Sequence, residues 1–343
     1  MEIKVLKNIN DFKDLEKSWS NLHDEITSRS VFQSFEFNYY SWVYELNNGK
    51  NTLAIVVVYN ENNLISIYPF YIDNRKRIRF INDNHADFCD CISIGKININ
   101  VVIKKLKTEY SINSFNLINL KVDASILDDF KLFPVSESSI RSAKYSVLEL
   151  SKGVFPDNFP EYKSKQKTEF RRVLKKNNDK SHKIISCNES SFPIEEINVL
   201  RDKMIDLGIR NNSFLSNSQL ELIDKLYQKE KLVISVVKTK GTINAISLLI
   251  KDSDQYLTWI DMYDDSKMIN IFNYISLITL LSSDKSVNIN FGRGSYAYKT
   301  SNFLPKIMNL YSLHIFTSKL EEFKYSIEGV IMKFLKGIYK KIK

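Results

Sequence analysis

An arginine between two glycines, followed by a tyrosine and a lysine, stands out in the stretch "INFGRGSYAYKTSNF" (289–303). The glycines let the backbone turn sharply after a strand, so Arg293 can be held at the strand end and clamp a phosphate or carboxylate with two hydrogen bonds. Tyr298 can protonate a leaving group, and Lys299 can hold an anionic group. The alternative is structural: an arginine that fixes the turn, a packed tyrosine and a surface lysine.

Three aspartates are candidate proton acceptors or hydroxyl-binding groups. Asp87 and Asp90 flank a phenylalanine in "HADFCD", where a carboxylate could take a proton from an attacking amine or bind the hydroxyls of a sugar. Turn capping is the common alternative for aspartate. A third carboxylate lies in "TWIDMY", where strand alternation predicts one aromatic and acidic face that suits a substrate cleft or plain exposure: Trp259, Asp261 and Tyr263.

Basic residues gather in the second half of the chain. Residues 1–150 have 18 basic and 19 acidic side chains, whereas the remainder has 31 and 21, so the whole excess of +9 lies there. In the helical pattern at 162–177, Arg171 and Arg172 could bind a nucleotide-sugar diphosphate or a lipid phosphate, or could simply form a solvated face. The tail 330–343 is basic and amphipathic, which fits either a membrane-surface helix or a packed terminal helix. No recognised nucleic-acid motif accompanies the charge.

Composition excludes several classes of protein. With 43% apolar residues, 9 glycines and 6 prolines in 343 residues, the chain can form two ordinary cores and is neither disordered nor collagen-like. No apolar run is long enough for a membrane span, and no apolar signal core follows Met1. The three cysteines form no disulfide framework, so we expect a reducing cytoplasm, and "HADFCDC" lacks enough nearby ligands for zinc; no metal is expected.

The hydrophobic periodicity predicts a mixed α/β chain with two similar halves. The expected helices are 12–22, 35–46, 99–110, 162–177, 194–207, 217–229 and 267–282, and the expected strands are 3–6, 52–59, 64–72, 114–120, 231–239, 243–251, 256–263 and 287–291. A hairpin and then a helix–strand pair recur about 170–180 residues apart, which indicates duplicated domains, at 1–155 and 156–343. Two unrelated domains of similar layout remain an alternative.

Four segments resemble the CelD-like acetyltransferases of the GNAT superfamily. They occur in that family's order and span about 270 residues: "SRSVFQSFEFNYYSWVYEL" (28–46), "HADFCD" (85–90), "YKSKQKTEFRRVLKK" (162–176) and "FGRGSYAYK" (291–299). The resemblance implies a tandem pair of GNAT-like domains with mixed, mostly antiparallel sheets flanked by helices. The Fem peptidyltransferases, which use aminoacyl-tRNA, are similar in plan.

By this resemblance, the chain is an N-acyltransferase that uses acetyl-CoA or another acyl-CoA. Its acceptor would be an amino group of a nucleotide- or lipid-linked sugar in bacterial cell-surface polysaccharide synthesis, at the cytoplasmic side of the membrane. Ser266 and Lys267, at the start of the helix after the meander, would bind the cofactor. The aspartates of "YDDS" would repel its pyrophosphate unless they face away. Two alternatives stay open: a Fem-like transferase that takes its acyl group from aminoacyl-tRNA, and a non-catalytic GNAT scaffold at the membrane surface.

Overall fold

The structure is a computed structural model, which describes residues 1–26, 30–130, 141–157, 159–160, 162–252, 255–266, 268–294 and 297–327. The basic tail 330–343 and Lys267 therefore lie outside the described residues. The chain forms two compact units. Unit 1 contains the described residues of Met1–Thr27, Leu46–Ser142 and Tyr311–Lys343, and unit 2 contains those of Ser28–Glu45 and Ala143–Leu310. The sequence-based domain boundary at 155 stays a prediction, because the compact units are assembled from interleaved segments.

Unit 1 combines short strands with helices that bury one apolar stripe each. Its strands are β1 (Glu2–Leu6), β2 (Thr52–Leu53), β3 (Ile55–Asn60), β4 (Asn63–Tyr68), β5 (Phe70–Ile72), β6 (Arg77–Phe80), β7 (Ile92–Ser93) and β8 (Ser114–Leu120). Its helices are α1 (Ile9–Asp14), α2 (Glu16–Glu25), α4 (Ile99–Glu109) and α5 (Ser125–Phe130). β1, β3, β4 and β7 form one antiparallel sheet, whereas β2, β5, β6 and β8 lie in the other, where β6 and β8 are parallel.

Unit 2 is built on a broad sheet with the strand order β10-β11-β12-β13-β14-β9. These strands are β9 (Arg141–Leu150), β10 (Lys180–Ile185), β11 (Leu232–Thr239), β12 (Thr242–Asp252), β13 (Gln255–Tyr263) and β14 (Val287–Arg293). The helical segments are η1 (Val31–Gln33), α3 (Phe35–Ser41), η2 (Trp42–Leu46), α6 (Ser164–Lys176), α7 (Ile194–Asp206), α8 (Asn217–Gln228), α9 (Ile269–Ser282) and α10 (Ala297–Phe303). The last strand, β15 (Lys306–Phe316), has residues in both units, as β9 does.

The two units share one order of elements, as the sequence predicts. In each unit antiparallel strands are followed by a helix and a strand parallel to an earlier one: α4 and then β8, which is parallel to β6, in unit 1, and α9 and then β14, which is parallel to β13, in unit 2. Unit 1 differs in that the short strand β7 stands between β6 and α4. Antiparallel pairs dominate both sheets. The expected mixed α/β layout with mostly antiparallel sheets is therefore confirmed.

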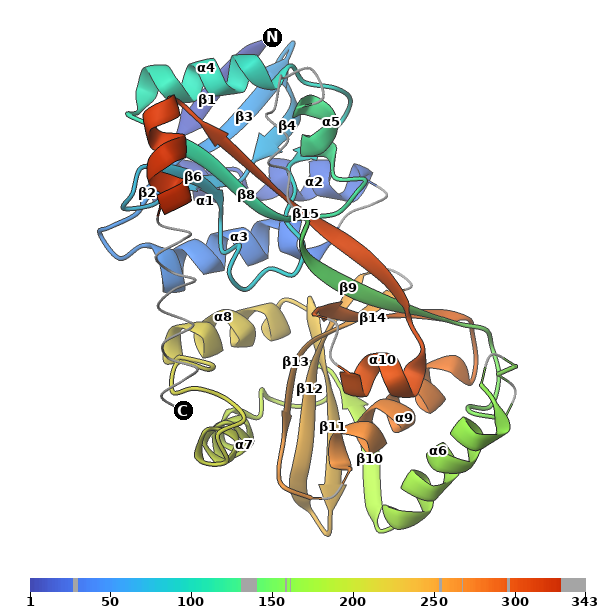
Figure 1. Cartoon of the computed structure of the whole chain (residues 1–343). Helices are drawn as coiled ribbons and strands as arrows, with labels where there is room; N and C mark the ends of the chain where they lie inside the picture. Colours follow the sequence, from blue (N-terminus) through green and yellow to red (C-terminus); the bar gives the residue numbers. More distant parts are fainter. Residues whose placement is uncertain are drawn as a thin grey trace. The chain divides into compact units, whose positions relative to one another are not determined.

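The core of unit 2 lies between its sheet and α6 and α9. Figure 1 shows these two helices on one side of the sheet, with α7 and α8 on the other. Aromatic rings fill the core, including Phe155, Phe170, Phe291 and Phe303, each 3% exposed or less. Most positions of α9 are apolar, and eight of its fourteen residues are buried, so this helix is packed on several sides.

Several boundaries and elements differ from the sequence-based expectations. The helix expected at 12–22 is two helices that meet at Leu15. The strand expected at 64–72 divides at Pro69, because proline has no N–H for the ladder, and β4 and β5 enter different sheets. The edge strand β10 was not expected, since its alternation of charged and half-buried residues resembles a loop.

Candidate active site

A row of three small or acidic side chains crosses the meander of unit 2. Ser235 on β11 lies opposite Ser247 on β12, and Ser247 lies opposite Asp261 on β13. All three residues are at most 9% exposed, although their strands are otherwise rich in aliphatic residues. Buried polar groups are costly without hydrogen bonds, so this row requires partners.

Asp261 is the centre of the resulting cluster. Its Oδ1 accepts a hydrogen bond from Ser247 (2.7 Å), and its Oδ2 accepts one from the hydroxyl of Tyr274 on α9 (2.5 Å). The hydroxyl of Tyr298 is 3.5 Å and the ammonium of Lys299 3.6 Å from the same Oδ2. The structure thus brings together three residues that the sequence singled out separately, from a strand and from α10.

Lys299 is a buried cation. It is only 4% exposed, its Nζ donates to the carbonyl of Phe291 (2.8 Å), and the rings of Tyr274, Phe291 and Tyr298 lie 5.5–5.8 Å from that nitrogen. A carboxylate, a carbonyl and three aromatic faces offset the cost of burying the ammonium. The alternative of a surface lysine is therefore wrong, because α10 directs this side chain inward.

Two tyrosines at this centre hold their protons firmly. Burial, and then the neighbouring charge of Asp261, raise the pKa of Tyr298 far above its ordinary value. The same two causes raise the pKa of the fully buried Tyr274. Both hydroxyls are therefore donors at neutral pH, and the half-buried Tyr298 is the more accessible of the two.

Arg293 is the last residue of β14 and lies between the two glycines. Gly292 and Gly294 both have positive φ (70° and 106°), a region that favours glycine. Gly292 lies inside β14 at a bulge opposite β9, and the strand continues to Arg293, so the chain bends after the arginine, at Gly294. The Gly294 N–H donates to the carbonyl of Lys144 on β9 (2.7 Å), and Arg293 itself is half-buried. Its role as an anion clamp stays a prediction.

The polar groups just before the start of α9 are already bonded within the protein. Asp264 accepts from the Ser266 N–H (2.9 Å) and from the side chain of Asn244 (2.8 Å), while Asp265 pairs with Lys203 on α7. The N–H of Ile269 is taken by the carbonyl of Ser266. The N-cap of α9 is Met268, in the left-handed conformation, and its side chain makes no capping hydrogen bond. Cofactor binding by Ser266 stays a prediction.

The expected strand face of Trp259, Asp261 and Tyr263 is interrupted by a bulge. Leu248 pairs with Ile260 and Leu249 with Thr258, so Trp259 is an extra residue in β13. Its ring packs edge-on against Phe32 and Phe37, whereas Asp261 contacts α9. Alternation from the sequence alone fails at this point, because a bulge reverses the side-chain order.

Asp87 and Asp90 belong to unit 1, where both are buried or nearly so. Asp90 accepts backbone hydrogen bonds from Ser125 (2.7 Å), Ile126 (3.0 Å) and Cys91 (2.8 Å). Burial raises its pKa to about 6, although these three donors favour the charged form. Asp90 therefore caps the first turn of α5, in line with capping as the alternative to proton transfer or sugar binding. Proton transfer by Asp87 stays a prediction.

The two arginines of α6 lie on its exposed face. Arg171 pairs with Asp157, and Arg172 pairs with Glu169 while its Nη2 lies 3.5 Å from the sulfur of Met268. Exposed pairs of this kind contribute little to stability and exchange readily for other anions. Phosphate binding by either arginine stays a prediction.

A polar chain leads away from Asp261 through the sheet–helix interface. Ser247 accepts from Asn273 Nδ2 (2.8 Å), Asn273 Oδ1 accepts from Ser235 (2.8 Å), and Ser235 Oγ is 2.7 Å from Nε2 of His182 on β10. Neither these residues nor Tyr274 are among the candidates that the sequence pattern singles out. The sequence feature that could have identified them is one serine in each of two apolar strands and an Asn–Tyr pair in a mostly apolar helix.

The pH dependence of stability should report on His182. Burial lowers its pKa from 6.5 to about 4, so below pH 6.5 the unfolded chain binds a proton that the native chain does not. This contribution is present above pH 6.5 and is lost as the pH falls to 4, by about 3 kcal/mol. In chemical denaturation we therefore expect the stability difference between wild type and His182→Gln to shrink by that amount. A difference that does not vary with pH would contradict the buried, neutral imidazole.

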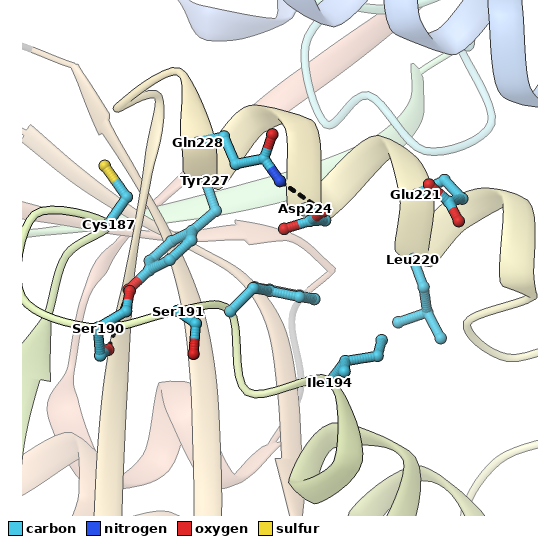
Figure 2. Close-up of a pocket in the computed structure, with 10 residues that line it drawn as sticks. Cys187, Ser190, Ser191, Ile194, Leu220, Glu221, Asp224, Tyr227 and Gln228 are labelled. Carbon is cyan, nitrogen blue, oxygen red and sulfur yellow. Dashed lines mark hydrogen bonds between the residues drawn. The ribbon is translucent and has the colours of Figure 1, made fainter.

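A separate cavity of about 360 Å³ lies between α8 and the loop before α7 (Figure 2). Tyr227 and Asp224 line it, but Tyr227 donates to the carbonyl of Ser190 and Asp224 accepts from Gln228. An adjoining cavity of about 400 Å³ shares the loop. None of the residues around Asp261 lines either cavity, so these hollows are not the centre described above.

Within the described part of the chain, no group of three or more His, Cys, Asp or Glu side chains could hold a metal ion. Cys89 and Cys91 are buried thiols, and Cys187 is half-buried. No helix among the described residues is long and apolar enough to cross a membrane.

Comparison with known proteins bears on the fold. No family model matches the sequence, and no curated protein matches it. Solved structures do match: the C-terminal domain (DUF2156) assigned to a lysylphosphatidylglycerol synthetase from Agrobacterium fabrum has a TM-score of 0.60 at 10% identity, over 93% of this chain and 97% of that one. L-PGS from Bacillus licheniformis gives 0.58 at 11% identity, over 88% and 92%. FemX gives 0.58 at 9% identity, over 94% and 99%.

These likenesses extend over nearly the whole length of each chain. At 9–11% identity they show the fold alone, which agrees with the expected tandem GNAT-like layout. The specificity of the CelD-like enzymes stays a prediction. This chain thus shares its fold with these three solved structures.

Proposed function

We propose that the chain transfers an activated acyl group to an amine, with its reaction centre at Asp261, Tyr298 and Lys299 in unit 2. The observation that carries this proposal is the meeting of a buried carboxylate, a protonated tyrosine and a buried ammonium within 3.6 Å of one oxygen, Asp261 Oδ2. A buried carboxylate, hydroxyl and ammonium gathered in this way are the side-chain types that acid–base chemistry uses.

Each side chain has a distinct role in the proposed reaction. The amine nitrogen attacks the acyl carbonyl and forms the C–N bond, and its proton passes to Asp261. Tyr298 gives its proton to the leaving atom of the carrier as that bond breaks, and regains a proton from Asp261. Lys299 stabilises the negative charge that develops on the acyl oxygen, and Tyr274 positions Asp261.

Aminoacyl-tRNA is the donor that the start of α9 favours. A pyrophosphate such as that of CoA needs free N–H groups at a helix start, but those of Ser266 and Ile269 are already bonded. The carboxylates of Asp264 and Asp265 add negative charge at the same place. FemX and L-PGS have this fold, and the resemblance to Fem enzymes implies an aminoacyl-tRNA donor.

The exposed face of α6 supplies a surface for the polyanion. It carries six exposed basic residues in and just before the helix: Lys163, Lys165, Arg171, Arg172, Lys175 and Lys176. The contact of Arg172 with Met268 places this face beside the start of α9 (Figure 1). Phosphates of tRNA would bind such a row through salt-sensitive contacts.

An acyl-CoA donor is the second candidate, and the edge of β13 favours it. β13 and β14 pair only at Gln255–Leu257 and Asn288–Asn290, so the β13 edge beyond the bulge is unpaired on that side among the described residues. An extended amide-containing arm such as pantetheine could add to this edge as a strand does. The acceptor under either donor would be an amino group. The resemblance to the CelD-like acetyltransferases implies that it belongs to a nucleotide- or lipid-linked sugar in cell-surface polysaccharide synthesis.

Calorimetric titration separates the two donors. We expect a charged tRNA pool to bind, with affinity that falls steeply with salt, and acetyl-CoA to give no saturable heat. Lys165→Gln/Lys175→Gln should weaken tRNA binding several-fold and reduce the salt slope by about one for each lysine that bound a phosphate. The matched control, Lys229→Gln/Lys285→Gln, removes two exposed lysines outside α6. Micromolar binding of acetyl-CoA, with tRNA binding unchanged in the α6 variant, would reject the tRNA donor.

A further inference from the structure

The polar chain that leads away from Asp261 contains five hydrogen-bonded groups and ends at His182. It joins four strands and α9 in the order His182, Ser235, Asn273, Ser247 and Asp261. The three middle residues are at most 3% exposed, whereas His182 is half-buried. Apolar side chains of the same size would pack this interface without polar groups to satisfy.

The bonds of this chain all run in one direction. Ser235 has one hydroxyl hydrogen, which it donates to Asn273 Oδ1, so His182 must donate from Nε2 to Ser235. Asn273 then donates to Ser247, and Ser247 donates to Asp261. Every donor points toward the carboxylate, which is the direction that favours its charged form.

The direction can also reverse without moving a heavy-atom position by much. If the amide of Asn273 turns by 180°, its oxygen accepts from Ser247 and its nitrogen donates to Ser235. Ser235 then donates to Nε2 of His182, whose proton sits on Nδ1. In this second state Ser247 is free to accept a hydrogen bond from a protonated Asp261.

We propose that Ser247, Asn273, Ser235 and His182 are positioning residues that let Asp261 alternate between carboxylate and carboxylic acid during acyl transfer. This rests on the proposed function, in which Asp261 takes the proton of the amine. When that proton arrives, each hydrogen bond of the polar chain reverses its direction. His182 then loses its Nε2 proton to solvent and takes a proton from solvent on Nδ1. The polar chain carries no net proton. Asp261 takes a proton from the amine on Oδ2, turns about its Cβ–Cγ bond so that this oxygen donates to Ser247, and turns back to return the proton to Tyr298.

Replacing Asp261 with asparagine should lock the second state. Tyr274, Tyr298 and Lys299 all present donors to Oδ2, so the amide oxygen of the new asparagine must occupy that position. Its NH₂ group then faces Ser247 and donates to it, which reverses every bond back to His182. One substitution would thus change the tautomer of a histidine four hydrogen bonds away.

Nitrogen NMR of histidine-labelled protein tests this without any substrate. The protein has four histidines, so their side-chain signals can be assigned by substitution. We expect His182 to be protonated at Nε2 in the wild type and at Nδ1 in Asp261→Asn. Ser235→Ala interrupts the polar chain, so adding Asp261→Asn to this variant should leave the His182 tautomer unchanged. The same tautomer in wild type and Asp261→Asn, or an Nδ1–H tautomer in the wild type, would overturn the proposal.

A rate measurement gives a second, independent readout. Ser235→Ala should lower kcat on the order of tenfold and leave KM unchanged, because it cuts the row of hydrogen-bond donors that ends at the charged Asp261, with two residues between the cut and that carboxylate. The matched control is Ser146→Ala, another buried serine of unit 2, whose hydroxyl has no hydrogen-bond partner among the described residues. Equal kcat values for the two variants would overturn the positioning role. Because the NMR result needs no donor, it can succeed or fail separately from the proposed reaction.

Discussion

Tyr298→Phe is expected to lower kcat by roughly 100- to 10,000-fold, the range that general acid catalysis contributes. The substitution removes only the hydroxyl, whose contact with Asp261 Oδ2 is long (3.5 Å), so the free energy of unfolding should fall by less than about 1 kcal/mol. Steady-state rates and denaturant unfolding of the same preparation would measure both effects.

The control for this prediction is Tyr256→Phe. Tyr256 is another half-buried tyrosine on β13 that packs against the same core. Its hydroxyl has no hydrogen-bond partner among the described residues, so this variant should keep the wild-type kcat. Full activity in Tyr298→Phe would show that another group protonates the leaving atom.

Lys299→Met should destabilise unit 2 by about 3–5 kcal/mol, because it leaves the buried carboxylate of Asp261 without its cation. Asp261→Asn should also be costly, since the ammonium of Lys299 then faces a neutral amide oxygen in place of the carboxylate. The double variant removes both charges, so we expect it to be more stable than the sum of the two single losses predicts. Chemical denaturation of the four proteins gives the coupling energy.

A second cycle at the exposed pair of Lys203 and Asp265 serves as the control. Their side chains are 40% and 65% exposed, so water already screens the charges and the coupling should be much weaker. Strictly additive losses at Lys299 and Asp261 would mean that the two residues do not compensate each other's charge.

Much of unit 2 follows directly from its sequence. The meander, α9 and β14 are long, strongly periodic segments, and their bounds agree with the expected ones within a few residues. The glycines around Arg293 specify a turn by local conformation alone. Short segments with mixed burial, such as β10, carry too little periodicity to identify.

The site is predictable only in its individual members. The residue types and their spacing single out Asp261, Tyr298 and Lys299, but nothing in the sequence predicts that α10 returns its two side chains to β13. That meeting depends on the turn after β14 and on packing of Phe303 in the core. The bulge at Trp259 likewise depends on strand register, which alternation does not reveal.

The interleaved composition of the two units is also a tertiary property. The segment that contains η1 and α3 joins unit 2, although it precedes most of unit 1 in the sequence. Its role is to supply Phe32 and Phe37, which pack against Trp259. A local pattern identifies such a helix but does not say which core receives it.

Single-turnover transfer from a tRNA pool charged with labelled amino acids, with hydroxylamine as the surrogate amine, tests the central claim most directly. If Tyr298 protonates the leaving atom, we expect the wild-type protein to form labelled hydroxamate and Tyr298→Phe to form it at least about 100-fold more slowly. No protein-dependent hydroxamate, or equal rates for wild type and Tyr298→Phe, would contradict acyl transfer at the Asp261, Tyr298 and Lys299 centre.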